Sequence, residues 1–410
     1  MEQTFMGYRR PDGSVGVRNH LIIIPSVFCA NTTVEKIAAQ VPGAIPMPHA
    51  VGCAQVGMDL ELTARTLTAM ACHPNVGAAV VVSLGCERFD PQEMVEAAKA
   101  IGKPLHLFVI QEEGGTTRTI EKASACARQL QKELDRMERT PCPVSELFIA
   151  TKCGGTDATS GLAANPAVGS MVDAVVAAGG SAILSECNEL LGTEDLLAKR
   201  AVNKEVADKI YDAIYGIEDL LRSGLDPTLP DKRNHLISRG NFAGGVSSIV
   251  EKALGGVHKS GTSPIVDVIE YAAPPQPGKR GLFLMNYESH DGEVVTGEIG
   301  CGAQMVAFTT GRGNPTGHPI APIIKITGNP QTYQHMEENF DFDASPIITQ
   351  GKTIEEMGQA LLDLVVRVAS GELTSAERLG GRELFCVGRR HGCRRKSREE
   401  LRAGHDCCGF

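Results

Sequence analysis

The sequence contains no tryptophan, and aromatic residues make up only 4% of its 410 residues. No apolar run approaches the length of about 18 residues that a membrane-spanning helix needs. The N-terminal stretch MEQTFMGYRR also lacks the apolar segment of a secretory signal peptide. We therefore expect a cytoplasmic protein that has no membrane segment.

Features of nucleic-acid-binding and nucleotide-binding proteins are missing as well. The net charge is −9, and basic residues gather only at the extreme C-terminus, so we expect no nucleic-acid partner. No GxGxxG motif opens a helix, and the glycine-rich runs KCGGTD and GRGNPTG are not a GxxxxGK[ST] phosphate loop. These glycines instead let the backbone approach a small anionic ligand closely.

The cysteines do not read as a disulfide framework. There are 13 of them, an odd number spread over a long chain. This pattern indicates reduced thiols or metal ligands in a reducing compartment.

What the sequence does contain is a repeated alternation of short apolar runs, polar loops and helical stretches. The runs that we predict as strands in the first half are residues 21–24, 44–47, 78–84, 105–110, 147–150 and 182–184. Such alternation predicts βαβ units and a mainly parallel, Rossmann-like sheet with helices on both faces. We expect residues 1–230 to form this first α/β lobe.

A second, smaller α/β lobe is expected for residues 231–380, with strands at 281–285, 304–308 and 323–326. Residues 381–410 form an atypical tail that is basic and rich in cysteine. Its residues Cys393, His405, Cys407 and Cys408 could be a zinc site, but their spacing fits no standard ligand pattern. The low apolar content favours disordered or aberrant sequence instead.

Polar residues follow the predicted strands. The run before Lys152 leads into Cys153, Gly154, Gly155 and Asp157, where a loop precedes the next helical stretch. Because parallel strands place their ligands at their carboxyl ends, we expect the polar loops to share one sheet edge. These are the loops that begin at Cys29, Cys86, Gln111, Lys152 and Glu186.

Cysteine recurs at this predicted edge. Cys29, Cys86 and Cys153 each follow a strand, and Cys53 lies in a turn four residues after His49. Small buried cysteines often fill tight turns, which is the plain structural interpretation of each one alone. Four of them at one edge, together with His49, suit a soft or borderline cation such as Fe²⁺ or Zn²⁺.

Acidic and basic residues accompany the cysteines. The carboxylates at the predicted edge are Glu87, Glu112, Asp157, Glu186 and Glu189. Glu87 and Glu186 directly follow apolar strands, so burial is expected to raise their pKa toward that of a general acid or base. Glu112 fits better as a cap of the following helix. Lys152 is a candidate base or carboxylate anchor, or else a solvated loop lysine.

Several unrelated short motifs occur in an order that resembles one known family. They are GYRRPDGSVGVRNHLIIIPSVFCAN, PHAVGC, HPNV, LGCE, TKCGGTDATSGLAANPAVG and TTGRGNPTGHPIAPIIK. Together they resemble the large catalytic portion of the altronate and galactarate dehydratases, over about residues 7–343. The family includes sulfolactate sulfo-lyase large subunits, but the last motif is closer to the altronate type. The tail after about residue 383 departs from the family ending.

The resemblance implies a hydro-lyase of sugar acid catabolism that usually depends on Fe²⁺ or another divalent metal. Many members carry or pair with a small SAF-type domain, so a separate small SAF-type subunit is implied, and we expect a homo-oligomer. The two other functions that stay open are a sulfolactate sulfo-lyase large subunit and a non-catalytic binding subunit that needs a partner.

The implied reaction is a β-elimination that turns an altronate-like aldonate or aldarate into a 2-keto-3-deoxy acid. It needs a cationic clamp on the carboxylate, a base and an acid. We assign Lys152 or Glu186 as the base and Glu87 or Asp157 as the acid. The expected metal ligands are His49, Cys53, Cys86 and Cys153. The expected substrate-binding residues are Arg18, Asn19, Asn31, Gln55, Gln111, Gly154, Gly155, Thr310 and Arg312.

Overall fold

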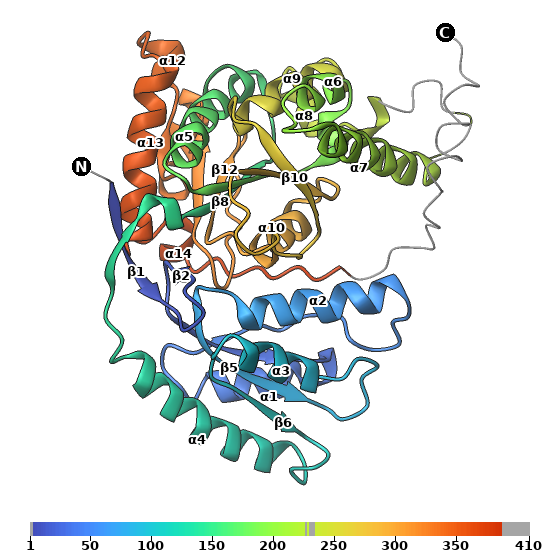
Figure 1. Ribbon diagram of the computed structural model, residues 1–410, viewed down its shortest axis with the longest axis vertical. Coiled ribbons are helices and arrows are strands. Elements are labelled where there is room, and N and C mark those ends of the chain that lie inside the picture. Colours follow the sequence, from blue (N-terminus) through green and yellow to red (C-terminus); the bar gives the residue numbers. More distant parts are fainter. Residues whose placement is uncertain (1–2, 226–227, 229–233, 388–410) are drawn as a thin grey trace.

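The computed structural model describes residues 3–225, 228 and 234–387, which form two α/β lobes (Figure 1). The larger lobe contains a seven-stranded, fully parallel sheet in the order β10-β11-β9-β8-β12-β13-β14. Its strands are β8 (Phe148–Cys153), β9 (Ser181–Leu184), β10 (Ile265–Glu270), β11 (Leu282–Asn286), β12 (Met305–Thr309), β13 (Ile323–Thr327) and β14 (Phe342–Asp343).

The smaller lobe contains a four-stranded parallel sheet in the order β4-β3-β5-β6. Its strands are β3 (His20–Pro25), β4 (Ile45–Pro46), β5 (Val76–Ser83) and β6 (Leu105–Val109). A third, antiparallel sheet of order β2-β1-β7 is formed by β1 (Thr4–Arg9), β2 (Val15–Gly16) and β7 (Thr140–Pro143). The chain passes through β7 on its way from the smaller sheet to the larger one.

The parallel α/β class with helices on both faces is confirmed, but the grouping of its strands is corrected. The sequence predicted one sheet over residues 20–190, whereas β8 and β9 join the strands of the second half. Local alternation predicts βα units, but which strands pair depends on long-range contacts that it does not encode. The division into lobes at residue 230 stays a prediction, although the seven-stranded sheet spans that position.

Apolar residues on both sides of each strand explain the helical covering of the smaller sheet. Leu21 and Ile23 face one core cluster, and Ile22 and Ile24 face another. Helices α1 and α4 contribute to the first cluster, and α2 and α3 contribute to the second. Their bounds are α1 (Asn31–Ala38), α2 (Met58–Cys72), α3 (Gln92–Ala100) and α4 (Thr116–Leu134).

The seven-stranded sheet is covered in the same way. Helices α5, α7 and α13 pack on one face, and α10 packs on the other. Helix α2 contacts α10, so one apolar cluster is shared by both lobes (Figure 1). The helices of this lobe are α5 (Asn165–Ala177), α6 (Glu194–Ala198), α7 (Lys204–Ser223), α8 (Arg239–Ala243), α9 (Ile249–Val257), α10 (Asp291–Gly300), α11 (Pro330–His335), α12 (Pro346–Thr349), α13 (Ile354–Ala369) and α14 (Ser375–Arg378).

Short turns of 3₁₀-helix and one π-helical turn complete the fold. They are η1 (Phe28–Ala30), η2 (Val144–Glu146), the π-helical η3 (Ser160–Ala164), η4 (Cys187–Leu190), η5 (Asn234–Leu236), η6 (His258–Ser260) and η7 (Glu337–Asn339). No helix among the described residues combines the length and apolarity needed to cross a membrane.

The predicted tail is described only as far as Val387, which is buried. Phe385 lies against His290, with ring centroids 5.7 Å apart, so the first residues of the tail pack on the larger lobe. The possible zinc ligands Cys393, His405, Cys407 and Cys408 lie outside the described residues.

Both parallel sheets reverse their strand order at one place. In the larger sheet the reversal lies between β8 and β12, and in the smaller sheet it lies between β3 and β5. In open α/β sheets a crevice for ligands forms at the carboxyl ends of the strands at such a reversal. The two sheets therefore provide two places where ligands are expected.

Candidate active site

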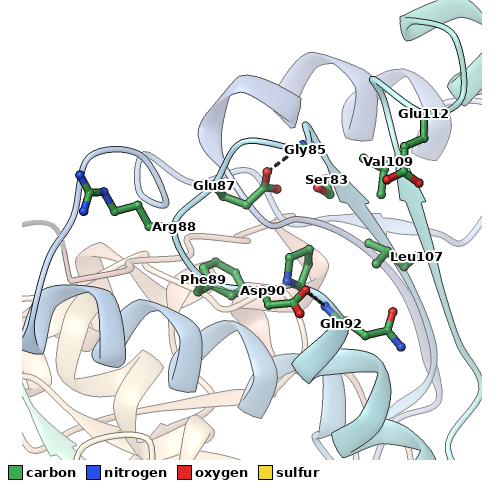
Figure 2. A pocket seen from close by; sticks show the side chains of 11 residues that line it. Ser83, Gly85, Glu87, Arg88, Phe89, Asp90, Gln92, Leu107, Val109 and Glu112 are labelled. Atoms are coloured by element: carbon green, nitrogen blue, oxygen red, sulfur yellow. Dashed lines mark hydrogen bonds between the residues drawn. The ribbon is translucent and has the colours of Figure 1, made fainter.

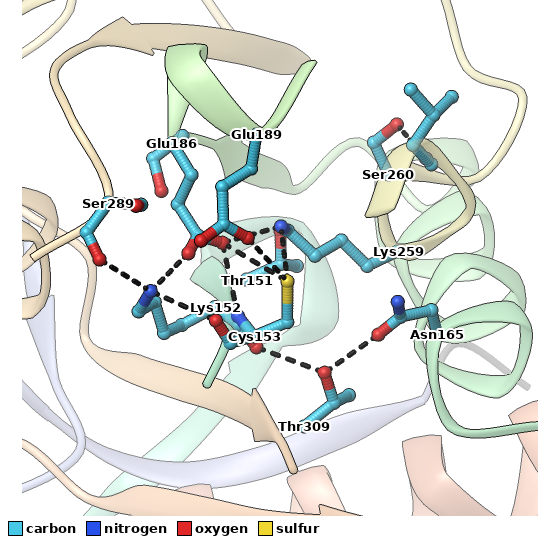
Figure 3. Close-up of polar contacts among 12 residues, drawn as sticks. Thr151, Lys152, Cys153, Asn165, Glu186, Glu189, Lys259, Ser260, Ser289 and Thr309 are labelled. Carbon is cyan, nitrogen blue, oxygen red and sulfur yellow. Dashed lines mark hydrogen bonds and ion pairs between the residues drawn. The ribbon is translucent and has the colours of Figure 1, made fainter. Parts of the chain in front are cut away.

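The carboxyl ends of β8 and β9 carry a buried cluster of charged residues (Figure 3). Lys152, Glu186 and Lys259 have fully buried side chains, and Cys153 is 2% exposed. Lys152 and Cys153 end β8, Glu186 follows β9, and Lys259 lies in η6. The interpretation of Lys152 as a solvated loop lysine is therefore wrong.

Glu186 forms ion pairs with two lysines, Lys152 and Lys259. Its backbone has φ +71°, a left-handed conformation that is uncommon outside glycine. Its carboxylate accepts hydrogen bonds from Lys152 Nζ on one oxygen and, on the other, from Lys259 Nζ at 2.5 Å and the Cys153 amide at 3.1 Å. Such a conformation at a buried charge marks a constrained site.

Glu189 extends the cluster on the side of Cys153. The Cys153 Sγ lies 3.5 Å from Glu189 and 3.2 Å from Lys259 Nζ. The other carboxylate oxygen of Glu189 accepts from Lys252 Nζ at 2.8 Å. Lys252 in turn donates to Asn241, so every charge in this part has a partner.

These charges set the direction of each pKa shift. Burial opposes ionisation of Glu186, but the ammonium groups of Lys152 and Lys259 outweigh it and lower its pKa to about 2. Burial likewise disfavours the charged form of Lys152, yet the charge of Glu186 raises its pKa well above 10.5. Burial and the charge of Glu186 raise the pKa of the Cys153 thiol to about 12. The expectation of a raised pKa for Glu186 is therefore wrong, because its lysine partners were not visible in sequence.

Cys153, Glu186 and Glu189 form a buried group that is compatible with a divalent metal ion. Their ligand atoms all lie within 4.8 Å of one another, and among the described residues no other group of three or more His, Cys, Asp or Glu does so. A thiolate with two carboxylates suits a borderline cation. The cation positions are, however, held by the ammonium groups of Lys152, Lys259 and Lys252, so a metal would have to displace Lys259 from Cys153.

The opposite face of the sheet holds a second buried lysine. Lys152, Phe308 and Lys325 are in register across β8, β12 and β13. Lys152 Nζ pairs with Asp291 of α10 at 3.0 Å, whereas Lys325 Nζ lies 3.8 Å from the Phe308 ring centroid and has no hydrogen-bond partner among the described residues. Burial lowers the pKa of Lys325 to about 7.

The neighbouring loops bring further predicted residues to this edge. Gly154 is buried, and a Cβ there would lie 2.8 Å from Asp291 and from the Phe308 ring. Gly155 has φ +60°, and a Cβ there would approach Thr310 and Arg312 of the loop after β12. The loops are joined by hydrogen bonds from Gly154 N to Thr309 O and from Gly311 N to Gly155 O, at 3.0 and 3.2 Å.

Asp157 lies at the same edge but is held by its own loop. Its Oδ1 accepts from the Thr159 hydroxyl at 2.7 Å and the Ser160 amide at 3.0 Å, and Oδ2 accepts from Asn329 at 2.8 Å.

The structure thus brings together eight of the predicted residues. They are Lys152, Cys153, Gly154, Gly155, Asp157, Glu186, Thr310 and Arg312.

The remaining nine predicted residues belong to the smaller lobe, and two of them lie at the wrong end of its sheet. Arg18 and Asn19 precede β3, so they are at its amino end. All the N–H groups of the Arg18 guanidinium are used by Glu377 and three backbone carbonyls. Asn19 bonds Arg10 and the Leu134 carbonyl. Both side chains are committed within the protein, so the structure does not support their predicted substrate contacts.

The predicted metal ligands do not converge either. His49 lies in the smaller lobe, where its Nε2 is 2.7 Å from Pro25 O and its Nδ1 accepts from the Val51 amide. Burial lowers its pKa, so the ring stays neutral with both nitrogens in use. Cys53 and Cys86 are exposed. None of the three belongs to the group around Cys153, because the sheet expected to unite them is two sheets.

The other predicted residues of the smaller lobe surround its carboxyl edge. Asn31 bonds the backbone of His49, Gln55 accepts from the Gly52 amide, and Gln111 is exposed after β6. Glu87 accepts from Ser26 and from three backbone amides, those of Leu84, Gly85 and Cys86. Burial acts to raise the pKa of Glu87, but these hydrogen bonds lower it overall. The expectation of a raised pKa is wrong for this residue too.

Sequence reasoning missed several charged residues at this edge of the sheet. Lys252, Lys259 and Asp291 come from stretches without a strand pattern, and nothing in the sequence places them beside Lys152. Glu298 lies in α10, where burial raises its pKa to about 8. Lys325 did leave a signal in the sequence, because it stands inside the apolar run IIKIT of the buried strand β13.

Comparison with known proteins identifies the family of the chain. Residues 144–391 match the family model of the D-galactarate/altronate dehydratase C-terminal region, and residues 7–135 match that of the D-galactarate dehydratase/altronate hydrolase second domain. The chain belongs to this dehydratase family. The two matches meet where the chain passes from the smaller to the larger sheet.

Individual members of the family are similar over most of the chain. It is 38% identical to the (2R)-sulfolactate sulfo-lyase subunit beta of Chromohalobacter salexigens, over 93% of this chain and 96% of that protein. It is 33% identical to the altronate dehydratase of Bacillus subtilis, over 93% of this chain and 77% of that protein. It is also 33% identical to the galactarate dehydratase (L-threo-forming) of Escherichia coli, over 90% and 73% respectively.

Proposed function

We propose that this chain is the catalytic subunit of a cytoplasmic hydro-lyase that converts a sugar acid into a 2-keto-3-deoxy acid. The observation that carries the proposal is the buried Lys152–Glu186–Lys259 cluster at the carboxyl ends of β8 and β9 in a member of a dehydratase family. Fixed ammonium groups in a water-poor site stabilise the negative charge that develops on a carboxylate when its α-proton leaves.

The reaction begins with removal of the proton on C2, next to the carboxylate. The electron pair left on C2 forms the C2–C3 double bond while the C3 hydroxyl, protonated by an acid, leaves as water. The resulting enol then takes a proton on C3 and becomes the 2-keto-3-deoxy acid. The base and the acid must therefore face the same substrate from different positions.

Three residues are candidates for the base. Lys152 and Glu186 lie at the carboxyl edge of the larger sheet, and Lys325 adds an amine with no hydrogen-bond partner among the described residues. Burial lowers the pKa of Lys325 to about 7, so a neutral amine is available near neutral pH. Asp157 is the better-placed acid, because Glu87 lies on the other sheet.

The proposed metal is Fe²⁺, as the family resemblance implies. When bound, iron supplies a Lewis acid for the substrate oxygens. Cys153, Glu186 and Glu189 offer one ligand set, provided that Lys259 moves away. The protein side chains Lys152, Glu186 or Lys325 and Asp157 would still transfer the protons and orient the substrate.

A second candidate function is sulfolactate sulfo-lyase. The higher identity to the sulfo-lyase subunit beta, 38% against 33% for the altronate dehydratase, favours it. The chemistry is related, because loss of the C2 proton would expel sulfite from C3. Both candidates are consistent with a separate small subunit of SAF type and with a homo-oligomer.

A coupled assay tests the proposal. The purified chain, with Fe²⁺ and the candidate small subunit, is offered aldonic, aldaric and sulfonated hydroxy acids. Formation of a 2-keto-3-deoxy acid from a sugar acid, with no sulfite from sulfolactate, is the expected result. Sulfite release alone replaces the first function by the second, and turnover of neither class favours a non-catalytic binding subunit.

A further inference from the structure

Asp291 is the exposed end of the buried charge cluster in the larger lobe. The base candidates Lys152, Glu186 and Lys325 are each fully buried. A base must lie within hydrogen-bond reach of the proton that it removes, so a substrate cannot meet these three side chains where they lie. Asp291 pairs with Lys152 at 3.0 Å, yet its side chain is 40% exposed. It therefore connects the buried charges to a place that a substrate can reach.

Two donors fix the position of this carboxylate. Asp291 is the first residue of α10, and its Oδ1 lies 3.0 Å from Lys152 Nζ. Its Oδ2 accepts from the side-chain amide of Asn314 at 3.3 Å. The Thr316 amide donates to Asn314 Oδ1 at 2.8 Å, which turns the amide nitrogen of Asn314 toward Asp291. The carboxylate is therefore oriented before any substrate binds.

Gly154 provides the space in which Asp291 meets the end of β8. A Cβ on Gly154 would lie 2.8 Å from Asp291 Oδ2, closer than side-chain carbons pack in proteins. An alanine at this position would therefore push the Asp291 carboxylate away from β8 and from Lys152. The short distance between Asp291 and Lys152 thus depends on a glycine directly after β8.

A buried amide adjoins the segment that leads into Asp291. Asn188 Nδ2 donates to the Ser289 hydroxyl at 2.9 Å, whereas Asn188 Oδ1 is buried and has no hydrogen-bond partner among the described residues. The Ser289 carbonyl in turn accepts from Lys152 Nζ at 3.3 Å (Figure 3). A buried acceptor without a donor costs about 1–3 kcal/mol, and a hydroxyl of a sugar acid would remove that cost. The segment before Asp291 thus offers a contact that suits a polyhydroxylated ligand.

The cavity at the carboxyl edge of the smaller sheet is a poorer place for an anionic substrate. It has a volume of about 470 Å³, and the charged residues that line it are Glu87, Asp90, Glu112 and Arg88 (Figure 2). Three carboxylates against one guanidinium repel a sugar acid. At the edge of the larger sheet, by contrast, Arg312 is exposed in the loop after β12 and can pair with a carboxylate.

We propose that Asp291 is the catalytic base that removes the C2 proton, and that Lys152 positions its carboxylate. The inference rests on the proposed hydro-lyase and adds a base that a substrate can reach. The C2–H bond breaks, its proton goes to Asp291, and its electron pair forms the C2–C3 double bond. The C3–O bond breaks, and the leaving hydroxyl takes a proton from the acid and departs as water. The exposed Asp291 then passes its proton to the solvent. In sulfolactate the same step would break the C3–S bond and release sulfite.

Kinetics of the full chain with Fe²⁺ and its small subunit test this role. The substrate is the sugar acid that the wild type converts, or sulfolactate if the wild type converts that instead. We expect Asp291→Asn to lower kcat by about 10²–10⁴-fold with little change in KM, and to increase the isotope effect of deuterium at C2. Glu293→Gln is the matched control, because it removes a charge from the same turn of α10 and should keep the wild-type kcat.

Asp291→Ala separates proton transfer from a purely structural role. Because this position is exposed, a small carboxylate added to the solution can take the place of the missing side chain. Acetate and fluoroacetate are similar in size and carry the same charge, but fluoroacetate is the weaker base. We expect acetate to restore turnover of Asp291→Ala more strongly than fluoroacetate at equal concentration and ionic strength, since proton transfer follows basicity.

An Asp291→Asn protein with the kcat of an active wild type would overturn the inference and leave the proposed function in place. Rescue that does not follow basicity would overturn it too, because Asp291 would then only hold Lys152. A wild type that converts neither a sugar acid nor sulfolactate would refute the proposed function and the inference with it. Circular dichroism checks that the variants fold, which is expected because Lys152 keeps its pair with Glu186.

Discussion

Glu186 shows how strongly the larger lobe depends on compensation of buried charge. It is fully buried with Lys152 on one side and Lys259 on the other, and each partner has further contacts. Removing one member of such a network leaves a charge without a partner in a poorly solvated place. The cluster is therefore both a chemical site and a point of high sensitivity to mutation.

Lys152→Met removes one of the two ammonium groups that pair with Glu186. We expect the free energy of unfolding to fall by about 3–5 kcal/mol, measured by denaturant titration at neutral pH. Lys204→Met is the matched control, because Lys204 is 85% exposed and its pair with Asp208 on α7 contributes less than about 0.5 kcal/mol. A Lys152→Met protein as stable as the control would show that the buried pair is not needed for the fold.

Glu298→Gln tests the effect of a buried carboxyl group. Burial raises the pKa of Glu298 to about 8, above its value of about 4.3 in an unfolded chain. The folded state therefore holds the proton more tightly, so the contribution to stability is complete below about pH 4 and is lost as the pH rises toward 8. The neutral amide lacks this loss and can still accept from Ser185.

We expect Glu298→Gln and the wild type to be equally stable near pH 4.5. By pH 7 the variant should be more stable by on the order of 3 kcal/mol, measured by unfolding at each pH. Glu121→Gln, at an exposed position of α4, is the matched control for the substitution itself. A stability difference for Glu298→Gln that stays constant from pH 4.5 to pH 7 would contradict the raised pKa of Glu298.

At the scale of elements, the close approach of α5 to η6 positions Lys259. A Cβ on Gly169 of α5 would lie 2.0 Å from His258 O, so only glycine fits against the η6 backbone. Gly169→Ala is expected to push η6, and with it Lys259, away from Cys153. We predict a loss of about 10–100-fold in kcat for the sugar acid, since displacements of about 1 Å can have this effect.

Gly216→Ala in α7 is the matched control for this change. A Cβ there meets no atom within 4 Å, so we expect unchanged activity and a gain in stability of at most about 1 kcal/mol. Equal activity of the two alanine variants would show that the position of η6 does not matter for turnover.

The strands themselves were largely readable from sequence, because β3, β5, β8 and β13 each contain a short apolar run that is buried on both faces of the sheet. Their pairing was not readable. The same βα alternation fits one sheet or two, and the structure divides the strands between two parallel sheets. The eight predicted site residues that converge come from the end of β8 and from loops of the larger sheet. The nine that do not join them belong to the smaller lobe.

At the scale of the whole molecule, the two lobes share one apolar cluster through α2 and α10. Met70 of α2 is fully buried there, and a Cβ on Gly300 of α10 would lie 3.5 Å from its methyl group. We therefore expect both sheets to unfold in one cooperative transition. Hydrogen exchange should give the same opening free energy for amides of β5 and β12.

Met70→Ala should lower both of these opening free energies by about 2–5 kcal/mol, since the site lies in the shared core. Protection in β5 that falls while protection in β12 stays at its wild-type value would show that the lobes are independent. In that case the crevices of the two sheets would have to be treated as separate sites.

The proposed elimination of water from a sugar acid passes through an enol. Turnover in D₂O, followed by NMR of the product, shows whether this enol forms. We expect one solvent deuterium on C3 of the 2-keto-3-deoxy acid, because the enol takes its proton from the medium. A product whose C3 carries only hydrogen from the substrate would contradict it.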